Sequence, residues 1–240
     1  MTDNPSLEAV QAALRFGEIE LKGQFLPGSN YTFFVNVYHG GEAFPAVYKP
    51  QRGEQPLWDF PESTLALREV AAHLVSEALG FHFVPFTTLR AEGPHGPGSL
   101  QQYVPYDPEY HYFSFTPQDR ERLRPAALFD LLINNADRKG SHIIIEDGTG
   151  EAGKLWLIDH GICFHVQNKL RTVIWDFAGQ PIPGELLEAL ERVPGLHGLL
   201  EPYLSREEIE ALESRARALL KRPVFPFQPT DRRAMPWPLL

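Results

Sequence analysis

Two short apolar segments joined by a turn rich in glycine and aspartate constrain the fold of this 240-residue chain more than any other feature. Residues 142–146 and 155–159 are each apolar and of extended character, and the DGTGEAGK sequence between them is typical of a turn. We therefore expect the two segments to pair as an antiparallel hairpin. If the pairing is symmetric about the turn, His142 lies opposite Asp159, with their Cβ atoms about 5 Å apart.

The hairpin also brings acidic residues together. Asp137 precedes it by one short loop, so this carboxylate and that of Asp159 are expected at the same end of the ladder. Carboxylates gathered at a strand end are costly to fold around unless a cation binds there. A divalent metal that carries a nucleotide is the usual cation of this kind. The hairpin thus indicates a metal and nucleotide site.

The character of the chain changes near residue 105. Before it, the sequence predicts strands around one helix: a hairpin that turns at His39–Gly41, a helix within residues 61–79 that ends at Gly80, and two further strands. After it come helical segments that flank the acidic hairpin, and residues 224–240 form a Pro-rich tail expected to pack as an irregular arm. We therefore expect an α+β protein with a β-rich lobe at residues 1–104 and a mainly helical lobe at residues 105–240.

Two sequence motifs resemble the catalytic and metal-binding loops of phosphatidylinositol 3/4-kinase-like proteins. They are DLLINNADRKGSH, which runs from Asp130 to His142, and LIDHG, which runs from Leu157 to Gly161. In that superfamily an Asp-Arg pair opens the catalytic loop, a metal-binding Asn follows, and an Ile-Asp-x-Gly segment plays the part of the kinase Asp-Phe-Gly. The resemblance looks closest to a small bacterial group and covers residues 16 to 165. It implies a two-lobed kinase-like fold: a small antiparallel β lobe with one helix, then a mainly helical lobe that carries the hairpin.

The resemblance assigns roles to four residues of these motifs. Asp137 is the candidate base or orienting group for an accepting hydroxyl, and Arg138 is expected to neutralise it or to contact phosphate. Asp159 is the candidate principal metal ligand, with His142 beside it. The other readings are an Asx-turn for Asp137, a turn acid for Asp159, a structural salt bridge for Arg138 and a simple hydrogen bond from His142 to Asp159.

His142 departs from the pattern of that superfamily, which has Asn at this position. An imidazole nitrogen suits Mn²⁺ or Zn²⁺ better than Mg²⁺. Because the imidazole must be neutral to bind, we expect metal affinity to fall as the pH drops through about 6.5.

A third motif, AVYKP at residues 46–50, supplies the nucleotide-binding side of the resemblance. Lys49 is expected to contact phosphates and to be held by Glu69 of the first helix, which we prefer to Glu62 and Glu77. A solvated strand-end lysine and a surface glutamate are the alternatives. Two further sets of candidate contacts rest on position alone: Gly28, Ser29 and Asn30 over the phosphates, and Gln102, Tyr103 and Val104 beside adenine.

Composition excludes several classes of protein. The formal net charge of −9 argues against a nucleic-acid partner and against broad adhesion to acidic membranes. A single cysteine, Cys163, allows no internal disulfide and is compatible with a reducing compartment. The N-terminal sequence lacks the pattern of a secretory signal, and no apolar run approaches the roughly 20 residues of a transmembrane segment. We expect a cytoplasmic protein.

Three functions fit these observations. The first is an ATP-dependent phosphotransferase that uses Mg²⁺ or Mn²⁺ and acts on an unidentified hydroxyl acceptor, which is a lipid, a protein or a small molecule. The second is a weak or inactive kinase-like module that binds nucleotide. The third is a metal-dependent hydrolase that adds His160 or His165 to the acidic site. The expected Lys49–Glu69 pair counts against the third, because a hydrolase needs no paired lysine in another lobe.

Overall fold

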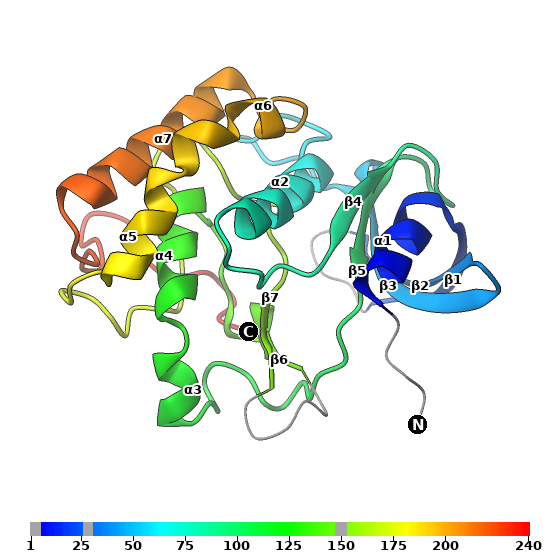
Figure 1. Cartoon of the computed structure of the whole chain (residues 1–240), viewed down its shortest axis with the longest axis horizontal. Coiled ribbons are helices and arrows are strands. Elements are labelled where there is room, and N and C mark those ends of the chain that lie inside the picture. Colours follow the sequence, from blue (N-terminus) through cyan, green and yellow to red (C-terminus); the bar gives the residue numbers. More distant parts are fainter. Residues whose placement is uncertain (1–5, 26–30, 147–152) are drawn as a thin grey trace.

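The computed structural model describes residues 6–25, 31–146 and 153–240. Figure 1 shows a sheet with one helix against it on one side of the molecule, a group of helices on the other side, and helix α2 between them. The predicted phosphate contacts Gly28, Ser29 and Asn30 lie outside the described residues.

The first part of the chain forms a five-stranded antiparallel sheet. Its strands are β1 (Glu18–Gln24), β2 (Phe33–His39), β3 (Glu42–Pro50), β4 (Thr87–Arg90) and β5 (Gly98–Gln102), in the spatial order β1-β2-β3-β5-β4. Strands β2 and β3 turn at Gly40 and Gly41, as the sequence predicted, and both glycines have positive φ. Residues with a Cβ rarely adopt this conformation, which is why glycine occupies the turn.

A helix that the sequence analysis missed packs on this sheet. Helix α1 (Leu7–Phe16) begins after Ser6, whose hydroxyl accepts a hydrogen bond from the Ala9 N–H. Its buried residues Val10, Ala13 and Leu14 have the spacing of a helical face and enter the core of the sheet. The expectation of one helix in this part of the chain is therefore wrong, since α1 accompanies α2.

Helix α2 (Leu65–Ala78) is the predicted helix, and Gly80, with φ of +76°, follows its end. Its buried face contacts both parts of the molecule. The His73 ring packs edge-on against Phe86 of the sheet's core, whereas Ala71, Ala72 and Val75 pack in the large core of the helical part. The helix that carries Glu69 thus also packs in the second part of the molecule, although its sequence belongs to the first.

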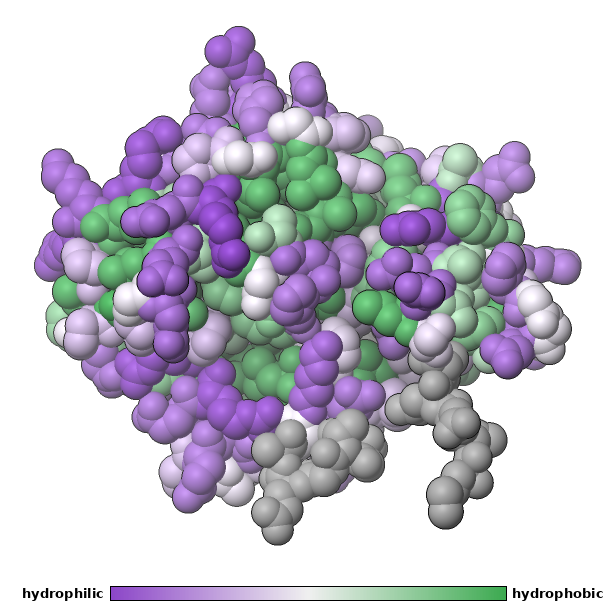
Figure 2. Space-filling view, viewed as in Figure 1, coloured by the Kyte–Doolittle hydropathy of each residue, from purple (hydrophilic) through white to green (hydrophobic). Residues whose placement is uncertain are grey.

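The helical part contains α3 (Pro117–Glu121), α4 (Arg124–Ile133), α5 (Gly184–Glu191), α6 (His197–Leu200) and α7 (Arg206–Lys221). Short 3₁₀ turns lie at Gln51–Gly53, Gly140–His142 and Val193–Leu196. Figure 2 shows hydrophilic residues spread over the visible face, with hydrophobic residues between them over its middle. None of the helices in the described part of the chain is both long and apolar enough to cross a membrane.

The Pro-rich tail packs as an irregular arm, as predicted. The Ala234 carbonyl accepts a hydrogen bond from Thr172 N–H, and the Leu239 carbonyl accepts one from Gly140 N–H. Gly140 lies two residues before His142 of the acidic hairpin, so the arm ends against the candidate site.

The acidic hairpin forms, but its register differs from the prediction by one residue. Strands β6 (Ile143–Ile145) and β7 (Leu155–Leu157) are antiparallel, with Ile143 paired to Leu157. In this register His142 lies across from Ile158, whose N–H donates to the His142 carbonyl at 3.1 Å. Asp159 follows the strand in a left-handed conformation with φ of +60°. That bend, rather than a cross-strand position, turns its side chain toward His142.

Candidate nucleotide and metal site

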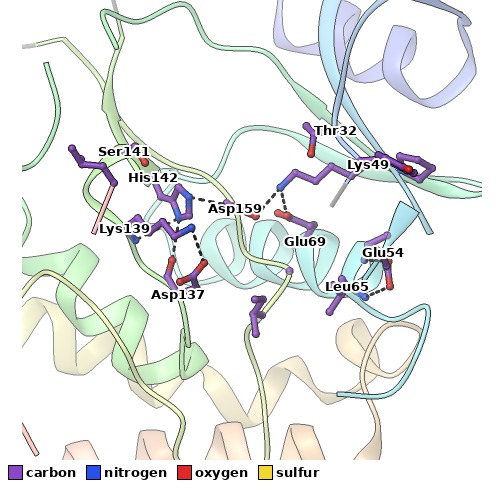
Figure 3. Close-up of a pocket in the computed structure, with 16 residues that line it drawn as sticks. Thr32, Lys49, Glu54, Leu65, Glu69, Asp137, Lys139, Ser141, His142 and Asp159 are labelled. Atoms are coloured by element: carbon purple, nitrogen blue, oxygen red, sulfur yellow. Dashed lines mark hydrogen bonds and ion pairs between the residues drawn. The ribbon is translucent and has the colours of Figure 1, made fainter. Parts of the chain in front are cut away.

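Three charged side chains from distant parts of the sequence converge beside strand β3. The Lys49 amine donates hydrogen bonds to Glu69 Oε1 of α2 and to Asp159 Oδ1 after β7, the second at 3.0 Å (Figure 3). Glu69 is 3% exposed, and its other oxygen accepts a bond from His160 N–H at 3.0 Å. The structure thus forms the predicted Lys49–Glu69 pair and adds Asp159 to it.

This arrangement keeps Lys49 and Asp159 ionised at neutral pH. Desolvation by the surrounding protein would lower the pKa of Lys49, but Asp159 and Glu69 outweigh it and raise that pKa above its usual value. Desolvation would likewise raise the pKa of Asp159, but the Lys49 ammonium holds it well below its usual range. The cluster therefore presents one cation between two carboxylates.

Helix α2 is fixed against the helical part next to Glu69. Arg68 is 1% exposed, donates to the Cys163 carbonyl at 2.6 Å and forms an ion pair with Glu208 of α7. Gly161 passes so close to α2 that a Cβ there would lie 3.7 Å from Glu69 Oε1. Sequence reasoning missed Arg68 and Glu208, because partners 140 positions apart leave no local signal. Their contacts hold Glu69 in place relative to the segment that carries Asp159.

His142 and Asp159 face each other as two acceptors. His142 Nε2 lies 3.3 Å from Asp159 Oδ2, and His142 Nδ1 lies 3.1 Å from the Asp137 carbonyl oxygen. The Asp137 carbonyl can only accept, and the competing donor to Nδ1, the Lys139 N–H, lies farther away at 3.5 Å. We therefore assign the proton to Nδ1, which leaves a lone pair on Nε2. A cation between Nε2 and the carboxylate would relieve the repulsion of the two lone pairs. An imidazole nitrogen and a carboxylate oxygen are both ligands for divalent metals, so these residues fit one.

Two protein ligands are too few for a self-sufficient metal centre. Among the residues that the structure describes, no group of three or more His, Cys, Asp or Glu side chains is placed to hold a metal. Nucleotide phosphates commonly supply the missing oxygen ligands of Mg²⁺. Burial lowers the pKa of His142 to about 4, with Asp159 opposing this shift. The predicted loss of metal affinity near pH 6.5 is therefore corrected to this lower range.

Asp137 lies on the other side of His142, on the loop between α4 and β6. Its N–H donates to Asn135 Oδ1 at 2.9 Å, and its carboxylate lies 3.4 Å from the Lys139 amine. Burial raises its pKa to about 6; Lys139 opposes this shift and Asp159 adds to it. A carboxylate of this pKa is ionised at neutral pH and accepts a proton more readily than an ordinary aspartate. Lys139 was missed, although its place two residues after Asp137 was a usable signal.

The prediction that Arg138 belongs to the catalytic group is wrong. Arg138 is fully buried and forms an ion pair with Asp130 at 3.0 Å, instead of neutralising Asp137. Its guanidinium also donates to the carbonyls of His142 and Ile158 at 3.1 and 2.8 Å. Arg138 thus joins the loop of Asp137 to both strands of the hairpin at its open end, and its role is structural.

Two cavities meet at the cluster and share Thr32, Lys49, Ser141, His142 and Asp159 as lining residues. The first, of about 280 Å³, is called here the acidic cavity, because its lining contains Glu54, Glu69 and Asp137. The second, of about 260 Å³, is called the apolar cavity. Its other lining residues are Phe25, Val47, Gln101, Gln102, Tyr103, Val104, Tyr106, Ile144 and Ile158. The predicted adenine contacts Gln102, Tyr103 and Val104 thus line the apolar cavity.

The two histidines of the hydrolase alternative do not join the site. His160 is buried, with Nε2 at 2.7 Å from the Arg138 guanidinium. His165 Nε2 lies 2.8 Å from the Asp59 carbonyl oxygen. Neither ring is directed at the metal ligands, so the geometry does not support a water-activating cluster.

The raised pKa of Asp137 gives a stability prediction. The folded protein holds a proton on Asp137 up to about pH 6, whereas the ordinary pKa of an aspartate is 3.8. Ionisation of Asp137 is unfavourable in the folded protein, so the free energy of unfolding falls as the pH rises through this window. Asp137→Asn should raise the melting temperature near pH 7.5 and change it little near pH 4, as measured by thermal denaturation. The matched variant Asp231→Asn, at an exposed position, should show no such pH dependence. Equal effects of Asp137→Asn at both pH values would contradict the raised pKa.

Comparison with solved structures gives the class of this fold. The chain resembles the crystal structure of the proinflammatory kinase CtkA from Helicobacter pylori, with a TM-score of 0.54 over 88% of this chain and 94% of that one. At 14% sequence identity this likeness shows a kinase-like fold and nothing finer.

Among curated proteins, the chain is 39% identical to Protein Rv2133c of Mycobacterium tuberculosis over 267 residues, which covers 95% of this chain and 94% of that protein. It belongs to the same family as Rv2133c. No family model matches the chain.

Proposed function

We propose that this protein is an ATP-dependent and metal-dependent phosphotransferase that acts on a hydroxyl acceptor. The observation that carries the proposal is the cluster of Lys49, Glu69 and Asp159 where the two cavities meet. A lysine held between a helix carboxylate and a potential metal ligand is the arrangement with which kinases position phosphates. A metal-dependent hydrolase would not need it.

In this proposal the apolar cavity takes adenine. Its lining of aliphatic and aromatic side chains suits a flat, largely apolar base. The N–H groups of Gln102 and Tyr103 already donate to the Phe86 and Pro45 carbonyls, at 2.8 and 3.2 Å. These two donors are therefore used within the sheet. Contacts of Gly28, Ser29 and Asn30 with phosphates remain a prediction.

The metal would be Mg²⁺ or Mn²⁺, held by Asp159 Oδ2 and His142 Nε2. When bound, it supplies positive charge to the triphosphate. Lys49 would hold the α- and β-phosphates, and Lys139 is placed to contact the γ-phosphate beside Asp137. Asp137 would orient the acceptor hydroxyl and take its proton while the oxygen–phosphorus bond forms, the γ-phosphate bond breaks and ADP leaves.

The broader assignments belong to the same proposal. Residues 1–104 would form the nucleotide-binding lobe and residues 105–240 the catalytic lobe, although α2 packs in the core of the latter. The net charge of −9 supports an acceptor other than nucleic acid. A cytoplasmic location and membership of the phosphatidylinositol 3/4-kinase-like superfamily also remain proposals.

A nucleotide-binding module without phosphotransfer is the second candidate. The observation that favours it is His142, which takes the position of the Asn ligand in the resembling superfamily. Such a module would bind ATP with metal and release no ADP.

The test is thermal denaturation with ATP and with Mg²⁺ or Mn²⁺, followed by an assay of ADP release. At ATP concentrations of 100 times Kd, binding should stabilise the fold by about 2.7 kcal/mol. Lys49→Met should remove most of this gain but keep the shift with metal alone, because Asp159 and His142 remain. Lys22→Met, on strand β1, is the control that should keep both shifts. An unchanged ATP shift in Lys49→Met would refute the role of Lys49, and bound ATP without ADP release would favour the second candidate.

A further inference from the structure

The acidic cavity contains a carboxylate that the proposed function does not use. Glu54 lies between β3 and α2, and its two oxygens accept hydrogen bonds from the N–H groups of Leu65 and Ala66 at 3.2 and 2.9 Å (Figure 3). These are the first residues of α2. The exposed amides and the dipole of a helix N-terminus form a natural site for a phosphate. In this cavity the protein has filled that site with its own carboxylate.

The other charges of the acidic cavity are also matched within the protein. Its lining contains two lysines: Lys49 is paired with Glu69 and Asp159, and Lys139 with Asp137. Among the described lining residues, no cation is left without a carboxylate partner. The lysines are also the groups that would meet the phosphates of ATP. An acceptor that brought a second phosphate would therefore find no free cation and would meet the charge of Glu54.

The cavity has the position and size for a small acceptor. It meets the apolar cavity at Lys49, and Asp137, the proposed base, lines it but not the apolar cavity. Its volume of about 280 Å³ suits a small molecule, and Tyr31, Leu65 and Leu240 add apolar surface to the walls. Both Glu54 oxygens already accept hydrogen bonds from backbone N–H groups, which leaves fewer lone pairs for a cationic acceptor but does not remove the negative charge.

We propose that the acidic cavity binds the acceptor as a small uncharged hydroxyl compound, and that Glu54 determines this specificity by excluding acceptors with a phosphate beside the reacting hydroxyl. This inference rests on the proposed phosphotransfer for the identity of the site as an acceptor site. The exclusion of anions by Glu54 is a separate property of the cavity, and it can be measured without turnover.

The first test measures binding of inorganic phosphate in EDTA, so that no metal occupies the site of Asp159 and His142. Glu54→Gln removes the charge and retains the shape of the side chain. In this variant we expect phosphate to bind at least about tenfold more tightly than in the unaltered protein, as measured by thermal shift. Glu62→Gln removes an exposed charge from the same connection and should bind phosphate like the unaltered protein. If Glu54→Gln unfolds, Glu54→Ala replaces it, because this variant also removes the charge and leaves the Leu65 and Ala66 N–H groups free to bind phosphate.

Equal phosphate binding by all three proteins would overturn the role of Glu54.

The second test measures ADP release by the unaltered protein with myo-inositol or with phosphatidylinositol vesicles. We expect the uncharged polyol to stimulate release and the vesicles not to do so; the reverse result would overturn the proposed substrate class. ATP binding, measured on the same samples, reports separately on the proposed function. If the unaltered protein does not bind ATP, the proposed phosphotransferase function is wrong, and the phosphate result on Glu54 still stands.

Discussion

Asp159→Asn is expected to abolish metal-dependent ATP binding and to reduce ATP turnover at least about a hundredfold. In the proposed site this carboxylate would be one of two protein ligands for the metal, and it is one of two anions beside the Lys49 amine. An amide oxygen carries no charge, so both interactions weaken. Titration of Mg²⁺ and Mn²⁺ in the presence of ATP, followed by thermal denaturation, measures the first effect, and ADP release measures the second.

The same substitution should leave the fold intact. The Asp159 side chain is 47% exposed, and its residue has a left-handed backbone conformation that Asn adopts readily. The Lys49 amine also keeps Glu69 as a partner. Asp137→Asn is the matched comparison, because it should retain metal-dependent ATP binding and lose turnover. If Asp159→Asn kept the full metal-dependent shift, the metal would have to bind elsewhere.

The sequence predicted the parts of the site that depend on local pattern. Lys49 ends a strand, Glu69 lies on an amphipathic helix, and Asp159 follows an apolar segment after a glycine-rich turn. Each of these positions follows from the period of a strand or a helix and from turn residues. The convergence of the three side chains then required only that the known order of elements in a kinase-like fold apply to this chain.

The predicted hairpin register and the predicted role of Arg138 failed for a different reason. The one-residue error in the hairpin register arose because the pairing is not symmetric about the glycine-rich segment: Ile143 pairs with Leu157, and the Glu146 N–H donates to the Lys154 carbonyl. Arg138 was assigned to catalysis because sequence cannot tell which of two nearby aspartates, Asp130 or Asp137, an arginine will meet. The structure places Asp130 on the buried face of α4 and directs Arg138 inward. Which aspartate pairs with the arginine depends on which side chains are buried together, and this is a property of the tertiary fold.

Arg138→Met is therefore expected to act on stability first, with a cost of about 3–5 kcal/mol. It leaves the fully buried carboxylate of Asp130 without its cation, although Asn135 and Thr172 still donate to it, each at 3.1 Å. It also removes the donors to the His142 and Ile158 carbonyls. Urea denaturation should show a lower midpoint at an unchanged slope. Arg122→Met breaks a partly exposed pair with Asp119 and should cost at most about 1 kcal/mol.

A double variant separates the lost ion pair from general damage to the core. If most of the cost is the unpaired carboxylate of Asp130, Arg138→Met combined with Asp130→Asn should be less destabilised than the sum of the two single variants, by about 1–3 kcal/mol. Strict additivity would show that the two side chains are not coupled. A variant Arg138→Met that kept its stability but lost ATP turnover would return Arg138 to the catalytic group. The ion pair predicts that stability falls first, because every contact of the guanidinium lies inside the protein, between Asp130, the loop of Asp137 and the open end of the hairpin.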